Sequence, residues 1–154
     1  LAKEKTDLEA IIGDKVVSSR QHYWNNEVPL TWKIQSEIGI KYDATFVRKN
    51  DAGFFDGIYY PFRPPHNGLI VFPTAIMEAY LMSKGRGSIK QAKKIIDQVI
   101  DISIKRKTIL TVSWHQRFIN PDEFPEFYAL YKYFLEIVYK MNGHFVLPSK
   151  IEYE

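Results

Sequence analysis

The chain has 154 residues, of which 45% are hydrophobic and 15% aromatic, and a formal net charge of +3. This length corresponds to one ordinary domain, and the apolar content is sufficient for a core, which excludes a disordered chain. The small net charge does not imply a nucleic-acid partner, and we expect none. Because cysteine is absent, disulfides and thiolate chemistry are excluded, and a metal would need His, Asp or Glu ligands.

The sequence shows no signal for a membrane or for export. No apolar run approaches the roughly 20 residues that a membrane-spanning helix needs, and residues 1–10 lack the pattern of a signal peptide. We therefore expect no membrane span and a cytoplasmic location.

The first third of the chain predicts a βαβ unit. Residues 6–12 have the apolar spacing of a short helix that ends at Gly13. Residues 15–19 and 40–47 are predicted strands, and 29–38 is a predicted helix between them. A strand, helix and strand in this order indicate two parallel strands.

The rest of the chain also alternates between strands and helices. A segment rich in proline and aromatic residues, at about 48–87, is interpreted as an insertion. We expect helices at 88–105 and 124–141, the first of them capped by Ser88, and strands at 69–72, 109–114 and 144–147. This alternation predicts an α/β fold of mainly parallel strands, either an open sheet or part of a barrel.

Polar side chains follow three predicted strands. These clusters are residues 20–24 after the first strand, Tyr42-Asp43 within the second, and residues 114–117 after the strand at 109–114. The carboxyl ends of parallel strands form one rim, where sites are assembled from several loops. Arg20, Asp43 and His115 in such positions suggest a hydrolytic site, with His115 as general acid, Asp43 orienting it, and Arg20 orienting a second carboxylate or holding an oxyanion.

Each of these residues also has an ordinary structural interpretation. His115 could be hydrogen-bonded to a neighbouring loop, Arg20 could be a surface arginine, and Asp43 could cap or pair locally. The basic stretch at 84–94 is best interpreted as the solvated face of a helix, and the aromatic residues at 124–134 as core, because they recur at helical spacing.

The order of three short motifs resembles a known family. These motifs are Arg20-Gln21-His22-Tyr23, Tyr42-Asp43-Ala44-Thr45 and Val112-Ser113-Trp114-His115. They are similar to the arginine, later aspartate and terminal histidine motifs of polysaccharide deacetylase-like proteins (the chitooligosaccharide deacetylase and carbohydrate esterase family four superfamily). The resemblance is to the divergent branch associated with surface-polysaccharide gene clusters. It covers most of the chain but only the C-terminal half of the family's partial or distorted (β/α) barrel, with 1–154 as a single domain or domain fragment.

The resemblance implies hydrolysis of an N-acetyl or O-acetyl group on a sugar. Arg20 would orient the catalytic-base aspartate, the Tyr23 backbone N–H would help hold the oxyanion, and His115 would protonate the leaving amine with Asp43 as its partner. His22, Tyr23, Trp24 and Trp114 are expected to bind the carbohydrate substrate.

A divalent, zinc-like metal is implied for the intact family domain, but its ligand motifs are absent from residues 1–19. The chain, which begins at Leu1, is therefore expected to be either a C-terminal piece of the domain or a form without the metal centre.

A second segment, residues 62–68 (FRPPHNG), also resembles the arginine motif of the family. We assign the family role to Arg20, because the chain after residue 68 leaves no room for the helix that follows the motif in the family. Residues 62–68 are then an extended loop stiffened by proline, and whether they contribute to the site stays open.

Two further classes of function remain as alternatives. One is a non-catalytic carbohydrate-binding or scaffolding module without a metal centre, in which Tyr23, Trp24 and Trp114 stack on sugar rings. The other is a phosphate- or nucleic-acid-binding module that uses the basic stretch at 84–94.

Overall fold

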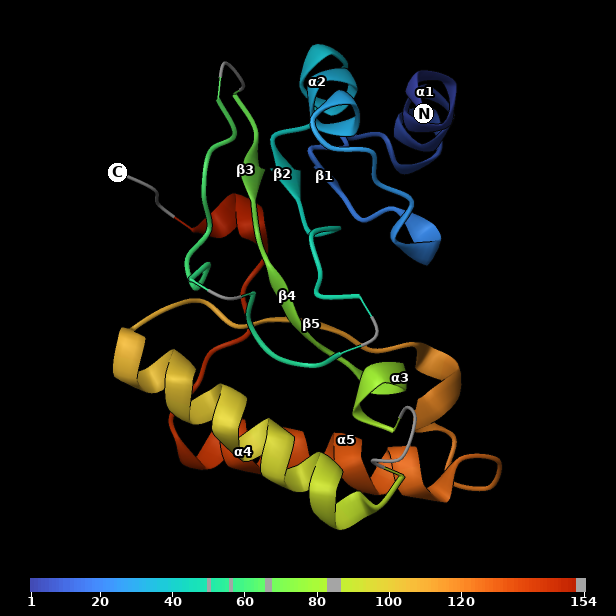
Figure 1. The fold of residues 1–154 in the computed structure, drawn as a ribbon. Coiled ribbons are helices and arrows are strands. Elements are labelled where there is room, and N and C mark those ends of the chain that lie inside the picture. Colours follow the sequence, from blue (N-terminus) through green and yellow to red (C-terminus); the bar gives the residue numbers. More distant parts are fainter. Residues whose placement is uncertain (50, 56, 66–67, 83–86, 152–154) are drawn as a thin grey trace. The chain divides into compact units, whose positions relative to one another are not determined.

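The computed structural model describes residues 1–49, 51–55, 57–65, 68–82 and 87–151 (Figure 1). The chain divides into two compact units. Unit 1 comprises Leu1–Val47, Tyr60–Pro73 and Val146–Glu154, and unit 2 comprises Arg48–Tyr59 and Thr74–Phe145. The sequence predicted a single domain and gave no sign of this division.

Unit 1 contains a parallel three-stranded ladder in the order β1-β2-β3. Helix α2 connects β1 to β2, so the βαβ unit predicted from the sequence is confirmed. The strands are much shorter than predicted, and Ser19 pairs with Asp43, which pairs with Val71. The elements of unit 1 are α1 (Ala2–Ile12), β1 (Ser18–Ser19), the 3₁₀ helix η1 (His22–Trp24), α2 (Leu30–Glu37), β2 (Tyr42–Asp43), β3 (Ile70–Val71) and the 3₁₀ helix η3 (Pro148–Lys150).

The core of unit 1 is small and aromatic. Trp32 on α2 is buried together with Ile40, Leu69 and Val71. The ring of Phe62 lies 5.7 Å from that of Trp32 and 5.6 Å, edge-on, from that of Phe46. Phe62, the first residue of the FRPPHNG segment, is therefore part of this packing.

Unit 2 contains a second parallel pair, β4 and β5, in which Met77 pairs with Ser113. A long helix connects the two strands and lies side by side with the last helix of the unit (Figure 1). The elements of unit 2 are β4 (Thr74–Met77), α3 (Glu78–Leu81), α4 (Ile89–Arg106), β5 (Thr111–Ser113), the 3₁₀ helix η2 (Gln116–Ile119) and α5 (Pro125–Lys140).

Helix α4 begins and ends where its sequence predicts. The Oγ of Ser88 accepts a hydrogen bond of 3.2 Å from the backbone N–H of Gln91 and so caps the first turn, as expected. The helix ends at Lys107, which adopts the left-handed conformation with φ 51°. Between these ends, buried apolar residues recur at intervals of three and four and form one face: Ala92, Ile95, Ile96, Val99 and Ile100.

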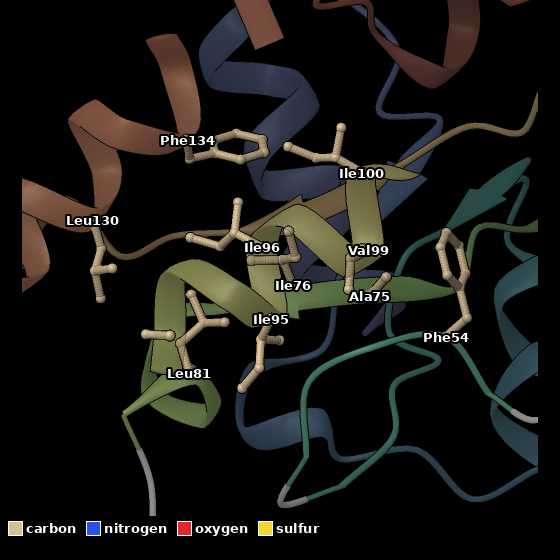
Figure 2. Close-up of a cluster of buried hydrophobic side chains, with 11 residues drawn as sticks. Phe54, Ala75, Ile76, Leu81, Ile95, Ile96, Val99, Ile100, Leu130 and Phe134 are labelled. Carbon is tan, nitrogen blue, oxygen red and sulfur yellow. The ribbon is translucent and has the colours of Figure 1, made fainter. Parts of the chain in front are cut away.

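This face of α4 packs into the core of unit 2 (Figure 2). Ile96 of α4, Ile76 of β4 and Leu130 of α5 are fully buried. Each such side chain contributes about 1.5–3 kcal/mol relative to the same side chain in water. The packing of α4 and α5 therefore supports the strand pair whose ends are described below.

The fold is mixed α/β with short parallel strands, which confirms the class predicted from the sequence. The strands in the described part of the chain form two ladders and no closed barrel. One detail of the prediction is wrong: residues 144–147 form no strand and are exposed, because no strand in the described part of the chain pairs with them. The segment at 48–87, which was interpreted as an insertion, contains β3, β4 and α3.

Candidate functional site

A carboxylate and an imidazole meet at the carboxyl ends of β4 and β5. Glu78 follows Met77, the last residue of β4, and His115 comes two residues after Ser113, the last residue of β5. Because the two strands are parallel neighbours, both side chains emerge at the same end of the pair. Nδ1 of His115 forms a short hydrogen bond with Oε1 of Glu78.

The two partners differ in their exposure to solvent. The side chain of Glu78 is fully buried, whereas that of His115 is 40% exposed. An ionised carboxylate only accepts hydrogen bonds, so the Nδ1 nitrogen of His115 donates to it, and the neutral ring then has its lone pair on Nε2. A buried acid that orients a solvent-accessible imidazole is an arrangement suited to proton transfer.

The second carboxylate oxygen of Glu78, Oε2, is buried and has no hydrogen-bond partner among the described residues. The indole Nε1 of Trp114, next to His115 in the chain, is likewise buried and without a partner. Burial of an unpaired polar atom costs about 1–3 kcal/mol. The unpaired Oε2 of Glu78 therefore lowers the stability of the fold, whereas Oε1 forms the hydrogen bond with His115.

Trp114 and His115 contact different parts of unit 2. The indole of Trp114 packs against the ring of Tyr131 on α5, with centroids 5.3 Å apart. The imidazole of His115 lies edge-on to Phe118, at 6.1 Å between centroids. The partly buried position of Trp114 and its contact with α5 favour a role in holding the wall of the site over that of an open stacking surface for a sugar.

Asp43 lies at the end of β2 in unit 1 and is fully buried. Its Oδ2 accepts hydrogen bonds from the Oγ1 of Thr45 (2.6 Å), the Nε2 of Gln35 (2.8 Å) and the Oγ of Ser19 (3.3 Å). Its Oδ1 accepts from the backbone N–H of Thr45 (3.0 Å). Both oxygens of Asp43 thus accept hydrogen bonds from neutral donors. These bonds connect β2, which carries Asp43, with β1 and α2.

Arg20 follows β1 in the same unit, and its side chain is exposed. Its Nε donates a hydrogen bond of 3.3 Å to the backbone carbonyl of Ala44, the residue after Asp43. The structure therefore places Arg20 and Asp43 at neighbouring strand ends, as predicted.

The predicted sugar-binding residues of unit 1 form the 3₁₀ helix η1. Tyr23 is 87% exposed, whereas Trp24 is only 8% exposed, so the indole of Trp24 does not offer an open face to a sugar. Tyr23 and Trp24 both have positive φ angles, 55° and 53°, a conformation that bulky residues rarely adopt and that is concentrated at functional sites. The exposed rings of His22 and Tyr23 lie 4.3 Å apart and together form the aromatic surface of this turn.

The three residues predicted to share one site lie in two units. Arg20 and Asp43 belong to unit 1 and His115 to unit 2. The prediction that all three line one rim therefore stays a prediction. Within unit 2, Nδ1 of His115 is hydrogen-bonded to Glu78, a partner that the sequence did not indicate.

Glu78 was missed because β4, the strand that precedes it, was not predicted. Only residues 69–72 were interpreted as a strand in this region, and they contain β3, a strand of the other ladder. An apolar strand that ends abruptly in a charged residue is the signal that identified His115, and it applies equally to Glu78. Gln35 gave no such signal, because it lies in the interior of a helix.

No group of three or more His, Asp or Glu side chains capable of holding a metal ion occurs within the described ranges. The divalent metal implied by the resemblance therefore stays a prediction.

The remaining candidate segments fall partly outside the described residues. His66 and Asn67 of the FRPPHNG segment, and Lys84 and Arg86 of the basic stretch, are not among them. Further along the basic stretch, the Nζ of Lys93 lies 4.4 Å from the ring centroid of Tyr133. Lys90 and Lys94 are exposed, so this part of the stretch is a solvated helix face, as expected.

No helix in the described part of the chain is long and apolar enough to cross a membrane. Comparisons with protein families, with curated proteins and with solved structures find no match to this chain.

Proposed function

We propose that the chain is a polysaccharide deacetylase-like hydrolase domain acting on acetylated sugars, with Glu78 and His115 as its proton-transfer pair. The observation that carries this proposal is the hydrogen bond between a fully buried carboxylate and a partly exposed imidazole at the ends of two parallel strands. The order of the motifs around Arg20, Asp43 and His115 supports the choice of substrate class, as does their position at strand ends.

In the proposed reaction His115 acts as a general acid. The protonated imidazole donates the proton on Nε2 to the sugar nitrogen or oxygen as the bond from that atom to the acetyl carbon breaks. Water supplies the hydroxyl group of the acetic acid that is released, and its other proton passes to the solvent, from which Nε2 of His115 is protonated again. Glu78 holds the ring through Nδ1 and stabilises its positive charge until the proton leaves. Proton transfer of this kind contributes about 10²–10⁴-fold to a rate.

A second candidate function is a non-catalytic carbohydrate-binding module. The observation that favours it is the aromatic surface of η1, where an 87% exposed Tyr23 is displayed on a left-handed backbone. Exposed aromatic rings provide stacking surfaces for sugars without any chemistry at the sugar. In this case the Glu78–His115 pair would have only a structural role.

Acetate release from N-acetylated and O-acetylated oligosaccharides tests the proposal. The assay is run with and without added Zn²⁺, because the resemblance implies a divalent metal. We expect the His115→Gln and Glu78→Gln variants to lose about 10²-fold or more of the activity. The matched control is His144→Gln, since His144 is an exposed histidine of the same unit, and we expect it to be unchanged.

The two candidate functions give opposite results. Binding of the oligosaccharides without acetate release, lost in Tyr23→Ala but retained in His115→Gln, would replace the hydrolase by the binding module. Neither binding nor release, with or without Zn²⁺, would rule out both functions for this chain.

A further inference from the structure

The arginine two residues after His115 lies against two aromatic rings. The guanidinium carbon of Arg117 lies 5.2 Å from the ring centroid of Phe118 and 5.1 Å from that of Phe124. Both distances are within the range of a cation–π contact. Phe118 in turn stacks on Phe127, at 4.5 Å between centroids and 26° between planes. The exposed side chain of Arg117 therefore rests on a packed aromatic support.

The positive charge of Arg117 is not neutralised locally. Three acidic residues follow in the same segment, namely Asp122, Glu123 and Glu126, yet Arg117 forms no ion pair with any residue that the structure describes. Contact with ring faces leaves the N–H groups at the edge of a guanidinium free to donate. This edge has the fork geometry that binds a carboxylate or a phosphate through two parallel hydrogen bonds.

The same ring borders both Arg117 and the imidazole of His115. Phe118 lies edge-on to His115 at 6.1 Å between centroids, and its backbone N–H donates a hydrogen bond of 3.0 Å to the carbonyl of His115. Arg117 and His115 are thus two residues apart in the chain and contact the same ring, that of Phe118.

We infer that Arg117 is a specificity residue that binds an anionic group of the substrate, so that the site acts on acidic acetylated sugars. This inference rests on the proposed function of Glu78 and His115 and adds the class of substrate. A uronic acid next to the acetylated sugar supplies the anion as a carboxylate, and a phosphorylated sugar supplies it as a phosphate.

Isothermal titration with three probes at low salt tests this inference. The probes are a tetrasaccharide of alternating N-acetylglucosamine and glucuronic acid, N-acetylglucosamine 6-phosphate, and the neutral chitotetraose. We expect the wild-type chain to bind one of the two anionic probes at least about tenfold more tightly than chitotetraose, because one charge-assisted hydrogen-bonded pair accounts for a difference of this size. The tighter of the two anionic probes identifies the carboxylate or the phosphate as the recognised group.

Variants then assign this preference to Arg117. Arg117→Gln should remove it and leave the affinity for chitotetraose unchanged, and Arg117→Lys, which keeps the charge but loses the fork, should retain part of it. The matched control is Arg106→Gln. The guanidinium carbon of Arg106 also lies over an aromatic ring, 3.7 Å from the ring centroid of Tyr59. Arg106, however, is the last residue of α4, which leads to the amino end of β5. Arg106→Gln should keep the full preference.

The outcomes separate this inference from the function on which it rests. The role of Arg117 is overturned if the wild-type chain binds acidic and neutral sugars equally, or if the preference survives in Arg117→Gln. The proposed function still stands in either case if acetate release depends on His115. If the chain binds none of the three probes and releases no acetate, both the inference and the proposed function fail.

Discussion

Asp43 in unit 1 and Glu78 in unit 2 are both fully buried carboxylates at the carboxyl ends of parallel strands. Their surroundings differ sharply. Both oxygens of Asp43 accept hydrogen bonds from neutral donors of its own unit. Glu78 has one oxygen hydrogen-bonded to a partly exposed imidazole, and the other has no partner among the residues that the structure describes.

We interpret this difference as one between a structural carboxylate and the carboxylate of the proposed site. A buried carboxylate with all its acceptor positions filled stabilises the chain around it, and removing it leaves donors unpaired. A buried carboxylate with an unpaired oxygen costs stability, and folds retain such groups mainly at sites where they do chemistry. Position at a strand end therefore does not identify a site; the hydrogen bonds around the side chain do.

The largest expected effect is the loss of stability in Asp43→Ala. This change leaves the backbone N–H of Thr45 and the amide of Gln35 with fewer acceptors in a buried position. We expect the free energy of unfolding to fall by about 3 kcal/mol, measured by urea denaturation. The exposed Asp122→Ala serves as control and should change little. A loss from Asp43→Ala no larger than that from the control would mean that Asp43 is not a structural carboxylate.

Removing a single donor should have a smaller effect. Gln35→Leu keeps the size of the side chain but takes away one hydrogen bond to Oδ2 of Asp43, which retains those from Ser19 and Thr45. The change also removes the hydrogen bond of 2.7 Å from Gln35 to the Oγ of Ser19, whereas loss of the buried Oε1 of Gln35, which has no partner among the described residues, offsets part of the cost. We expect a net loss of about 1 kcal/mol in the free energy of unfolding. Because Gln35 and Asp43 share a hydrogen bond, the double variant with Asp43→Ala should lose less than the sum of the single changes. Strict additivity would argue against the shared bond.

Glu78→Met should behave in the opposite way. The substitution keeps the length of the side chain and removes the buried, unpaired Oε2, while the exposed part of His115 remains in contact with solvent. We expect the free energy of unfolding to be unchanged or to rise by up to about 1 kcal/mol. Acetate release should be lost in the same variant. A large loss of stability would place Glu78 in the same class as Asp43.

The smallest expected effect is a change in the pH dependence of stability, and it involves a third carboxylate, that of Asp97 on α4. It accepts a hydrogen bond of 2.8 Å from the hydroxyl of Tyr133 on α5. Burial and, to a lesser extent, this bond raise the pKa of Tyr133 above its ordinary value of 10.0.

The sign of the pH dependence follows from this direction. Near pH 10 the unfolded chain releases the phenolic proton while the folded chain keeps it, so the free energy of unfolding falls as the pH rises from there through the raised pKa. Denaturant titrations from pH 9 to pH 11 should show a shallower decline in Tyr133→Phe than in the wild type. Identical slopes would contradict a raised pKa.

Local sequence patterns predicted much of the fold. The apolar spacing of α4 with its Ser88 cap, and the helical spacing of the aromatic residues of α5, were sufficient to place both helices within a few residues. The alternation of strands and helices correctly indicated parallel pairing. The pattern could not give the lengths of the strands or the division into two units, because both depend on which distant segments pair with one another.

The sequence pointed to one member of the Glu78–His115 pair, and the roles given to the site residues stay predictions. The abrupt end of an apolar strand identified His115, and the same reasoning pointed to Asp43. The sequence could not show that Asp43 is satisfied by Gln35 and Thr45, since Gln35 comes from a helix eight residues earlier in the chain. It also could not show that His115 meets Glu78, 37 residues away, because that contact depends on the pairing of β4 with β5.

The most direct test of the account is the position of the proton on the neutral ring of His115. Nitrogen-15 NMR of the imidazole distinguishes a proton on Nδ1 from one on Nε2. If Glu78 orients His115 as an acid–base group, the wild-type chain should carry the proton on Nδ1, and Glu78→Met should shift it toward Nε2. A wild-type ring protonated on Nε2, or one that Glu78→Met leaves unchanged, would contradict the claim that this pair is the functional centre of the chain.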